Sequence, residues 1–352
     1  MKKSIDFRLS LDETLIIKGL AICLMLWHHL FYMHPEYGSF VYQTAQFGKL
    51  CVSLFLFVSA YGLTIQYGKI IDKPITETFK FQAKRFVKFY ANYWVIFLIF
   101  VPIGIFVFGR GLGVPYGEAN HIKMLIKDIL GINSFQSYNI TWWFNQLIIC
   151  LYLVFPILYF VTRKISVLVI ILWYVVLRLK IPFIPNEVVF WALHFSLGIL
   201  LAQNTERLNQ FLNRFNRFLL LGFFVLTFVA LSICRNFGII PILNGTTADA
   251  FLALNIAFLV ILTIRNNTYA ITKPLKFLGE HSINIYMIHT FIYYYWFGNF
   301  FYSFKYPIVI FVVLLAVCLI VSVVLEYLKK MAKLSLLVNK INQRITEKKS
   351  SR

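Results

Sequence analysis

A lysine and a histidine in one strongly apolar stretch are the first residues of this 352-residue chain that could do chemistry. Lys18 and His29 lie eleven residues apart within the stretch 14–33. At 100° per residue, eleven helical steps bring them to within about 20° of one face, whereas Lys18 and His28 are about 80° apart. Charged and titratable groups are costly inside a bilayer and usually functional there. The spacing therefore predicts that Lys18 and His29 share one helix face and belong to a functional site.

The composition indicates which elements position these residues. Hydrophobic residues make up 60% of the chain and charged residues only 14%, whereas a soluble domain has about half and about a quarter. The fold class predicted is all-α, a polytopic transmembrane helix bundle of about ten spans. Segments able to cross about 30 Å of hydrocarbon fall at 14–33, 47–66, 89–109, 141–161, 165–179, 187–202, 218–234, 248–264, 282–301 and 306–327.

The distribution of basic residues orients this bundle. With ten spans and the N-terminus inside, about 25 of the 34 Lys and Arg residues fall in the inside segments and about 7 in the outside loops. Basic residues accumulate in cytoplasmic loops. Both termini are therefore predicted to be cytoplasmic.

The net charge of +20 does not indicate a nucleic-acid partner. The basic residues lie in short loops beside apolar spans rather than on one soluble face, so they favour orientation and contact with the lipid bilayer. We predict a transmembrane domain at 1–328 and a basic cytoplasmic tail at 329–352. The five cysteines show no CxxC spacing, which predicts free thiols and no metal site.

A second group of basic residues precedes the third span. Arg85 and Lys88 are three residues apart and share a helix face at the predicted cytoplasmic mouth of the bundle. That placement suits the phosphate groups of a nucleotide. The alternative is that both residues only orient the span.

Further polar residues fall within predicted spans. Ser282, Tyr286 and His289 occupy one face of the ninth span, and polar residues in this arrangement should face the bundle interior. They either line a cavity or only pack. Ser59 and Tyr61 in the second span are further cavity candidates. The tenth span is almost purely aliphatic and indicates a packing or lipid-facing helix.

Five stretches, in the expected order, resemble the acyltransferase-3 family of integral-membrane acyltransferases. They are Lys18-Gly19-Leu20-Ala21-Ile22 followed by His29, Leu54 to Tyr61, Arg85-x-x-Lys88 with Tyr93-Trp94, Thr141-Trp142-Trp143-Phe144 through Phe155-Pro156, and Leu278 to His289. Three positions depart from the family pattern, because Lys18 and Lys88 stand where Arg is common and Ala60 where Gly is common. A lysine lacks the planar fork with which Arg binds two oxygens.

The resemblance implies an activity and its partners. Members transfer an acyl group, usually acetyl, from acyl-coenzyme A to a hydroxyl of a cell-envelope glycan or lipid-linked saccharide. It implies a protein of the bacterial cytoplasmic membrane, with acyl-coenzyme A as a substrate and no permanently bound cofactor. On this basis His29 and Lys18 are the catalytic candidates, and Arg85 and Lys88 are the donor-binding candidates. Polysaccharide-synthesis proteins are possible partners.

Two mechanisms remain open for His29. Neutral imidazole is a suitable general base for a hydroxyl, and an acyl-imidazole intermediate would let donor and acceptor bind in turn. Lys18 would steady negative charge on the donor or on the developing oxyanion, or would only extend its ammonium to the inner interface.

Two other classes of function also remain open. A glycan exporter or flippase would need polar groups along its cavity, but the internal repeats and interrupted helices of transporters are not evident. A scaffold in envelope polysaccharide synthesis would leave Lys18 and His29 unexplained. The membrane-bound O-acyltransferases, a separate enzyme family, are disfavoured because the motifs differ.

Overall fold

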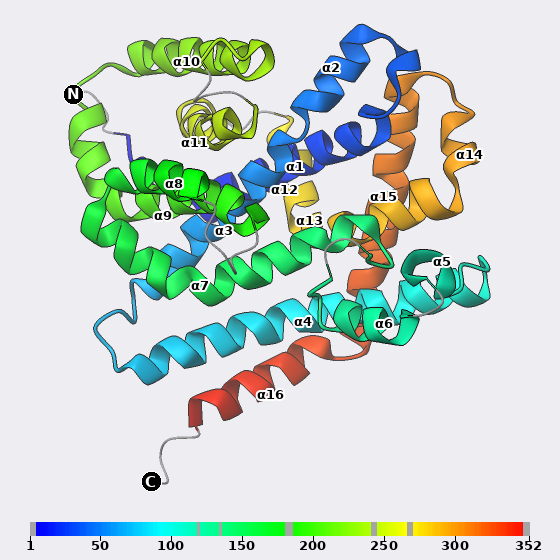
Figure 1. Ribbon diagram of the computed structural model, residues 1–352. Coiled ribbons are helices and arrows are strands. Elements are labelled where there is room, and N and C mark those ends of the chain that lie inside the picture. Colours follow the sequence, from blue (N-terminus) through cyan, green and yellow to red (C-terminus); the bar gives the residue numbers. More distant parts are fainter. Residues whose placement is uncertain are drawn as a thin grey trace. The chain divides into compact units, whose positions relative to one another are not determined.

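The chain folds as a set of helices. The computed structural model (Figure 1) describes residues 5–117, 120–133, 136–179, 186–240, 245–265 and 270–347. Within these ranges the regular structure is helical and includes no strand. The prediction of an all-α polytopic bundle is confirmed.

Eight helical segments of the described chain are long and apolar enough to cross a membrane. They coincide with eight of the predicted spans, so the prediction of a membrane protein is confirmed. Their bounds are Leu11–Phe31, Ser39–Tyr67, Ile75–Phe106, Ile140–Ile165, Val188–Leu212, Arg217–Phe237, Thr247–Ile264 and Pro307–Met331.

The predicted fifth and ninth spans fall on shorter helices. The described part of helix α8, Leu168–Leu179, has 12 residues, which correspond to about 18 Å. The ninth falls on α13, Ser282–Thr290, which continues as a π-helix, η4, over Phe291–Trp296. Eight and ten are both even, so the termini lie on one side if both segments cross the membrane or if neither does.

The helices group into two compact units. The first comprises residues 1–69 and 154–280, and the second comprises 70–153 and 281–352. Helix α7, Trp143–Ile165, contributes to both units and contains Pro156.

The first unit is built around α1 and α3. Helix α3 packs against α1, α9 and α11, and α1 packs against α12. The side chains of Ile17, Leu26, Phe57 and Phe195 are completely buried there. The helices of this unit are α1 (Leu11–Phe31), α2 (Ser39–Phe47), α3 (Leu50–Tyr67), α8, α9 (Asn186–Leu212), α10 (Arg217–Phe237), α11 (Gly245–Ile264) and α12 (Thr272–Glu280), with the short η1 (Pro35–Tyr37).

The second unit is built around α4. Helices α13 and α16 both pack against α4, and α15 packs against α13 and α16. Its elements are α4 (Ile75–Phe106), α5 (Gly113–Tyr116), α6 (His121–Ile129), η2 (Ile140–Trp142), α13, η4, α14 (Gly298–Tyr302), α15 (Pro307–Met331) and α16 (Leu334–Glu347). Residues 348–352 of the predicted tail lie outside the described residues.

The five cysteines are free thiols, as the sequence predicted. Cys51 and Cys318 are buried, and the other three are partly buried.

The side of the membrane on which residue 214 lies distinguishes ten spans from eight. With ten spans Arg214, which is exposed, is cytoplasmic, and with eight it is outside. We expect Arg214→Cys, in a chain without native thiols, to react with an impermeant maleimide only after the cells are opened. Glu36→Cys should react in intact cells, and reaction of Arg214→Cys in intact cells would contradict the ten-span arrangement.

Candidate functional site

The beginning of α1 is fixed by hydrogen bonds and an ion pair. The hydroxyl of Ser10 accepts from the backbone N–H of Glu13, and the Glu13 carboxylate accepts from the N–H of Ser10 at 2.7 Å. This is a capping box, which satisfies donors that the first helical turn leaves unpaired. The buried Glu13 carboxylate also binds the Arg265 guanidinium through two contacts, at 2.8 and 2.6 Å. The start of α1 is therefore held in place.

Two glycines bring α1 and α12 into backbone contact. A Cβ on Gly19 would overlap the carbonyl oxygen of Leu275, and a Cβ on Gly279 would overlap that of Leu15. The two contacts are reciprocal, so the helices run antiparallel with glycine opposite backbone at both positions. Small residues permit such close approach of membrane helices. The glycines of two family motifs therefore place the helix that carries Lys18.

Lys18 and His29 lie on one uninterrupted helix. Helix α1 runs from Leu11 to Phe31, so the eleven steps between the two residues correspond to about 16 Å along its axis. Both side chains are partly buried. The prediction that they share one face requires a continuous helix, and α1 is continuous between them.

His28 is oriented by the backbone of α2. Its Nδ1 lies 2.7 Å from the carbonyl oxygen of Ala45. Since a carbonyl only accepts, this nitrogen carries the proton and donates, and the Nε2 lone pair is left as the basic position of the ring. The ring stacks on Tyr32 at 4.7 Å and lies 5.2 Å from the ring of His29. These contacts fix the orientation of the His28 ring.

Ser59 and Tyr61 differ in exposure. Tyr61 is only 2% exposed, and its hydroxyl accepts a hydrogen bond from the backbone N–H of Leu9 at 3.0 Å. It therefore ties α3 to the segment that leads into α1. Ser59 is partly exposed.

Arg85 and Lys88 lie on α4, in the second unit. The Arg85 guanidinium lies over the Phe81 ring, 5.1 Å from its centroid, and Lys88 is exposed. The aromatic pair that follows has a structural role, because Tyr93 and Trp94 donate hydrogen bonds to carbonyls in the last turn of α6. The motif thus combines two cations with the residues that anchor a neighbouring helix.

Ser282, Tyr286 and His289 lie on α13, in the second unit. His289 is completely buried, and its Nδ1 donates to the Tyr286 carbonyl oxygen at 2.8 Å. The Tyr286 hydroxyl donates to the carbonyl oxygen of Thr141 at 2.8 Å. Ser282 is also buried and Tyr286 is partly buried, so this stripe faces the interior of its unit.

Asn139 connects η2 to α13, and sequence reasoning missed it. Its side-chain oxygen accepts from the hydroxyls of Thr141 and Thr290, both at 2.7 Å. Its side-chain nitrogen donates to the carbonyl oxygen of Met287 at 3.3 Å, which also accepts from Trp142 Nε1 at 3.2 Å. A buried amide is expected to satisfy its polar atoms in this way. Asn139 is a neutral residue in no charged or titratable pattern, so the sequence gives no signal for this role.

A buried lysine at the end of α15 was also missed. The Lys329 side chain is 6% exposed, and its Nζ donates to Asn92 at 2.9 Å, Asn284 at 2.7 Å and Glu326 at 2.8 Å. Three acceptors satisfy the three donors of an ammonium. Asn284 also donates to Ser322 Oγ at 3.0 Å. Helix α15 runs to Met331, past the predicted end of the tenth span at 327, and its last turns carry a polar network that joins α4, α13 and α15.

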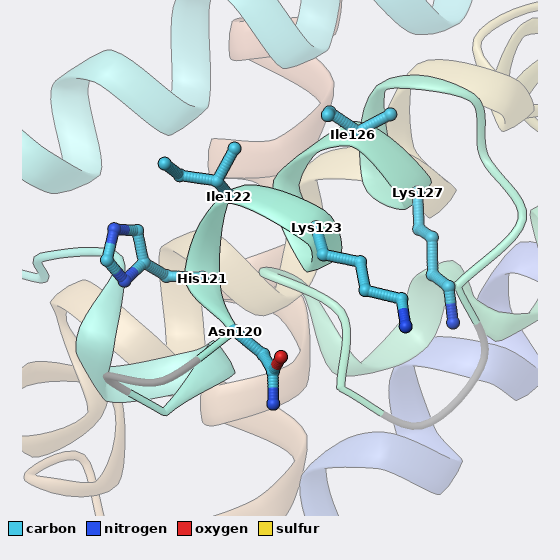
Figure 2. Close-up of a pocket in the computed structure, with 6 residues that line it drawn as sticks. All are labelled: Asn120, His121, Ile122, Lys123, Ile126 and Lys127. Carbon is cyan, nitrogen blue, oxygen red and sulfur yellow. The ribbon is translucent and has the colours of Figure 1, made fainter.

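The candidate residues divide between the two units. Lys18, His29, Ser59 and Tyr61 belong to the first unit, and the remaining candidates, Arg85, Lys88, Ser282, Tyr286 and His289, belong to the second. Within the described ranges, no three His, Cys, Asp or Glu side chains are grouped as metal ligands. A pocket of about 490 Å³ lies on α6 (Figure 2), away from all nine candidates in the sequence.

The fold defines the class, a polytopic helical membrane protein with titratable groups on its helices. The sequence model of a family described as an acyltransferase domain, acyltransferase-3, matches residues 9–327. The chain belongs to the acyltransferase-3 family and is a membrane acyltransferase. No curated protein and no solved structure matches it.

The contact between α1 and α12 gives a prediction about stability. Gly19→Ala should lower the free energy of unfolding by about 1–3 kcal/mol, because the new Cβ meets a backbone carbonyl that cannot rotate away. The measurement is the midpoint of heat-induced loss of monodisperse protein in detergent. Gly222→Ala in α10 is the matched control, since a Cβ there meets nothing within 4 Å. Equal midpoints for the two variants would show that the contact is not tight.

Proposed function

We propose that this acyltransferase moves an acetyl group from acetyl-coenzyme A to a hydroxyl of a cell-envelope glycan or lipid-linked saccharide. It would act in the bacterial cytoplasmic membrane, with both termini cytoplasmic. Family membership supports the reaction class. The observation that carries the proposal is the position of Lys18 and His29 on one continuous apolar helix, since charged and titratable groups are costly inside a bilayer and usually functional there.

His29 acts as the general base in this proposal. Its neutral imidazole takes the proton of the acceptor hydroxyl as the hydroxyl oxygen attacks the thioester carbonyl carbon. The C–O bond forms, the C–S bond breaks, and the coenzyme A thiolate takes the proton back from the imidazolium. An acyl-imidazole at His29 is the alternative route to the same products.

The length of α1 favours one role for Lys18. About 16 Å of helix separates Lys18 from His29, which is too far for the ammonium to contact an oxyanion that forms beside the imidazole. Lys18 is therefore assigned to negative charge on the donor.

Arg85 and Lys88 are assigned to the phosphates of the donor. They lie on one face of α4, and Lys88 is exposed, so an anion can reach them. The exposed Lys88 and the partly buried Arg85, on a helix that also carries Lys80 and Lys84, form a suitable phosphate site.

The proposed role of His29 is tested by comparing the two histidines of α1. His29→Ala should insert normally. It should lower the rate of glycan acetylation by a factor of roughly 10² to 10⁴, the usual effect of losing a general base. The measurement is glycan acetyl content in cells, normalised to protein in the membrane fraction.

The control is His28→Asn. Its side-chain amide can still donate to the Ala45 carbonyl, so the helix contact is kept and much of the activity should remain. Wild-type acetylation by His29→Ala would refute the assignment. Loss of glycan export together with acetylation would favour an exporter.

The second prediction concerns the donor site. The double variant Arg85→Ala/Lys88→Ala should raise the apparent KM for acetyl-coenzyme A by at least about tenfold, because charge-assisted hydrogen bonds to phosphate are lost. Lys88→Arg should be tolerated. The control Lys69→Ala/Lys73→Ala removes two exposed lysines and should leave KM unchanged. An unchanged KM in the Arg85/Lys88 variant would mean that these cations only orient the span.

A further inference from the structure

Helix α6 exposes an apolar strip beside a cationic strip. Ile122, Ile126 and Ile129 are 64%, 52% and 38% exposed, and their i, i+4, i+7 spacing aligns them on one side of the helix. Lys123, which is exposed, and Lys127, which is partly exposed, lie one step further around the helix and four residues apart. The exposed half of α6 is therefore divided lengthwise between isoleucine and lysine.

The opposite side of α6 is held by Asp128, which is buried. Its carboxylate accepts from the Tyr116 hydroxyl, from Ser137 Oγ at 2.8 Å and from the backbone N–H of Tyr138 at 2.5 Å. Burial raises the pKa of this carboxyl, and the three donors oppose that shift. Asp128 faces inward, so it does not neutralise the lysines on the exposed side.

The end of α6 is anchored as well. Its last turn and the following residue present three carbonyl oxygens to α4, which accept hydrogen bonds from Tyr93, from Trp94 Nε1 at 2.8 Å and from the Tyr90 hydroxyl at 2.9 Å. Three aromatic donors therefore fix the rotation of α6 about its axis. As a result of this anchoring the three isoleucines and Lys123 are exposed and Lys127 is partly exposed.

The pocket of about 490 Å³ runs along these exposed strips. It is lined by Asn120, His121, Ile122, Lys123, Ile126 and Lys127. Figure 2 shows Lys123 and Lys127 extending side by side in one direction, with Ile122 and Ile126 on another edge of the helix. Among the described residues neither lysine forms an ion pair. Two ammonium groups spaced by one helical turn can contact one phosphate.

We propose that α6 lies in the membrane interface and binds an anionic phospholipid there. The isoleucine strip contacts the acyl chains, and Lys123 and Lys127 bind the headgroup phosphate. A helix with one apolar and one cationic strip lies along a bilayer surface in this way, and lysines attract anionic headgroups. The proposal does not depend on acyl transfer.

The test places a fluorophore at position 122 of the full-length chain. Ile122→Cys, in a chain without native thiols, is labelled with an environment-sensitive dye and reconstituted in phosphatidylcholine nanodiscs that contain either brominated phosphatidylglycerol or brominated phosphatidylcholine. Bromine quenches the dye on contact. The mole fraction of brominated phosphatidylglycerol that gives half-maximal quenching should be roughly tenfold lower than that of brominated phosphatidylcholine. This is the order expected for two lysines near an anionic headgroup.

Variants of the two lysines supply the controls. In Lys123→Gln/Lys127→Gln, half-maximal quenching should occur at equal mole fractions of the two brominated lipids. In Lys123→Arg/Lys127→Arg, the difference between the two mole fractions should remain. Lys69→Gln/Lys73→Gln removes a pair with the same spacing and should have no effect. Absence of quenching by either lipid would overturn the interfacial position, and equal quenching by both lipids in the parent would overturn phosphate binding.

Discussion

The reciprocal backbone contact between α1 and α12 is the constraint on which the first unit depends. Gly19 and Gly279 each face a carbonyl of the partner helix, so neither helix can rotate without a clash. The capping box and the bond between Glu13 and Arg265 fix where α1 begins. Together these contacts set the rotation of α1 and its axial position relative to α12, and therefore the positions of Lys18 and His29 in the first unit.

The second unit is organised by buried polar groups instead of glycine contacts. Lys329 joins three helices through three hydrogen bonds, and Asn139 joins η2 to α13. Leaving any of these groups unpaired in an apolar surrounding would cost on the order of 1–3 kcal/mol. These networks consequently make the position of α13, with Tyr286 and His289, specific. Both units thus hold their polar side chains on helices whose rotation is restricted.

Much of the fold could be predicted from the sequence because membrane spans depend on local apolar length. Eight predicted spans correspond to long helices, and α1 carries Lys18 and His29 as expected. The predicted fifth and ninth spans fall on shorter helices, since apolar composition does not reveal where α13 becomes a π-helix. The partners of Asn139 and Lys329 could not be predicted, because they lie up to 237 residues away in the chain. Such contacts follow from packing rather than from any local pattern.

The central claim is acyl transfer from coenzyme A to a glycan, and it can be measured directly with purified protein. The chain is reconstituted in liposomes and incubated with radiolabelled acetyl-coenzyme A and isolated envelope glycan, and the label in the glycan is then counted. The account predicts that label enters the glycan, that mild base releases it as acetate from an ester, and that empty liposomes transfer none. Folded protein that leaves all of the label on coenzyme A with every envelope glycan supplied would contradict it.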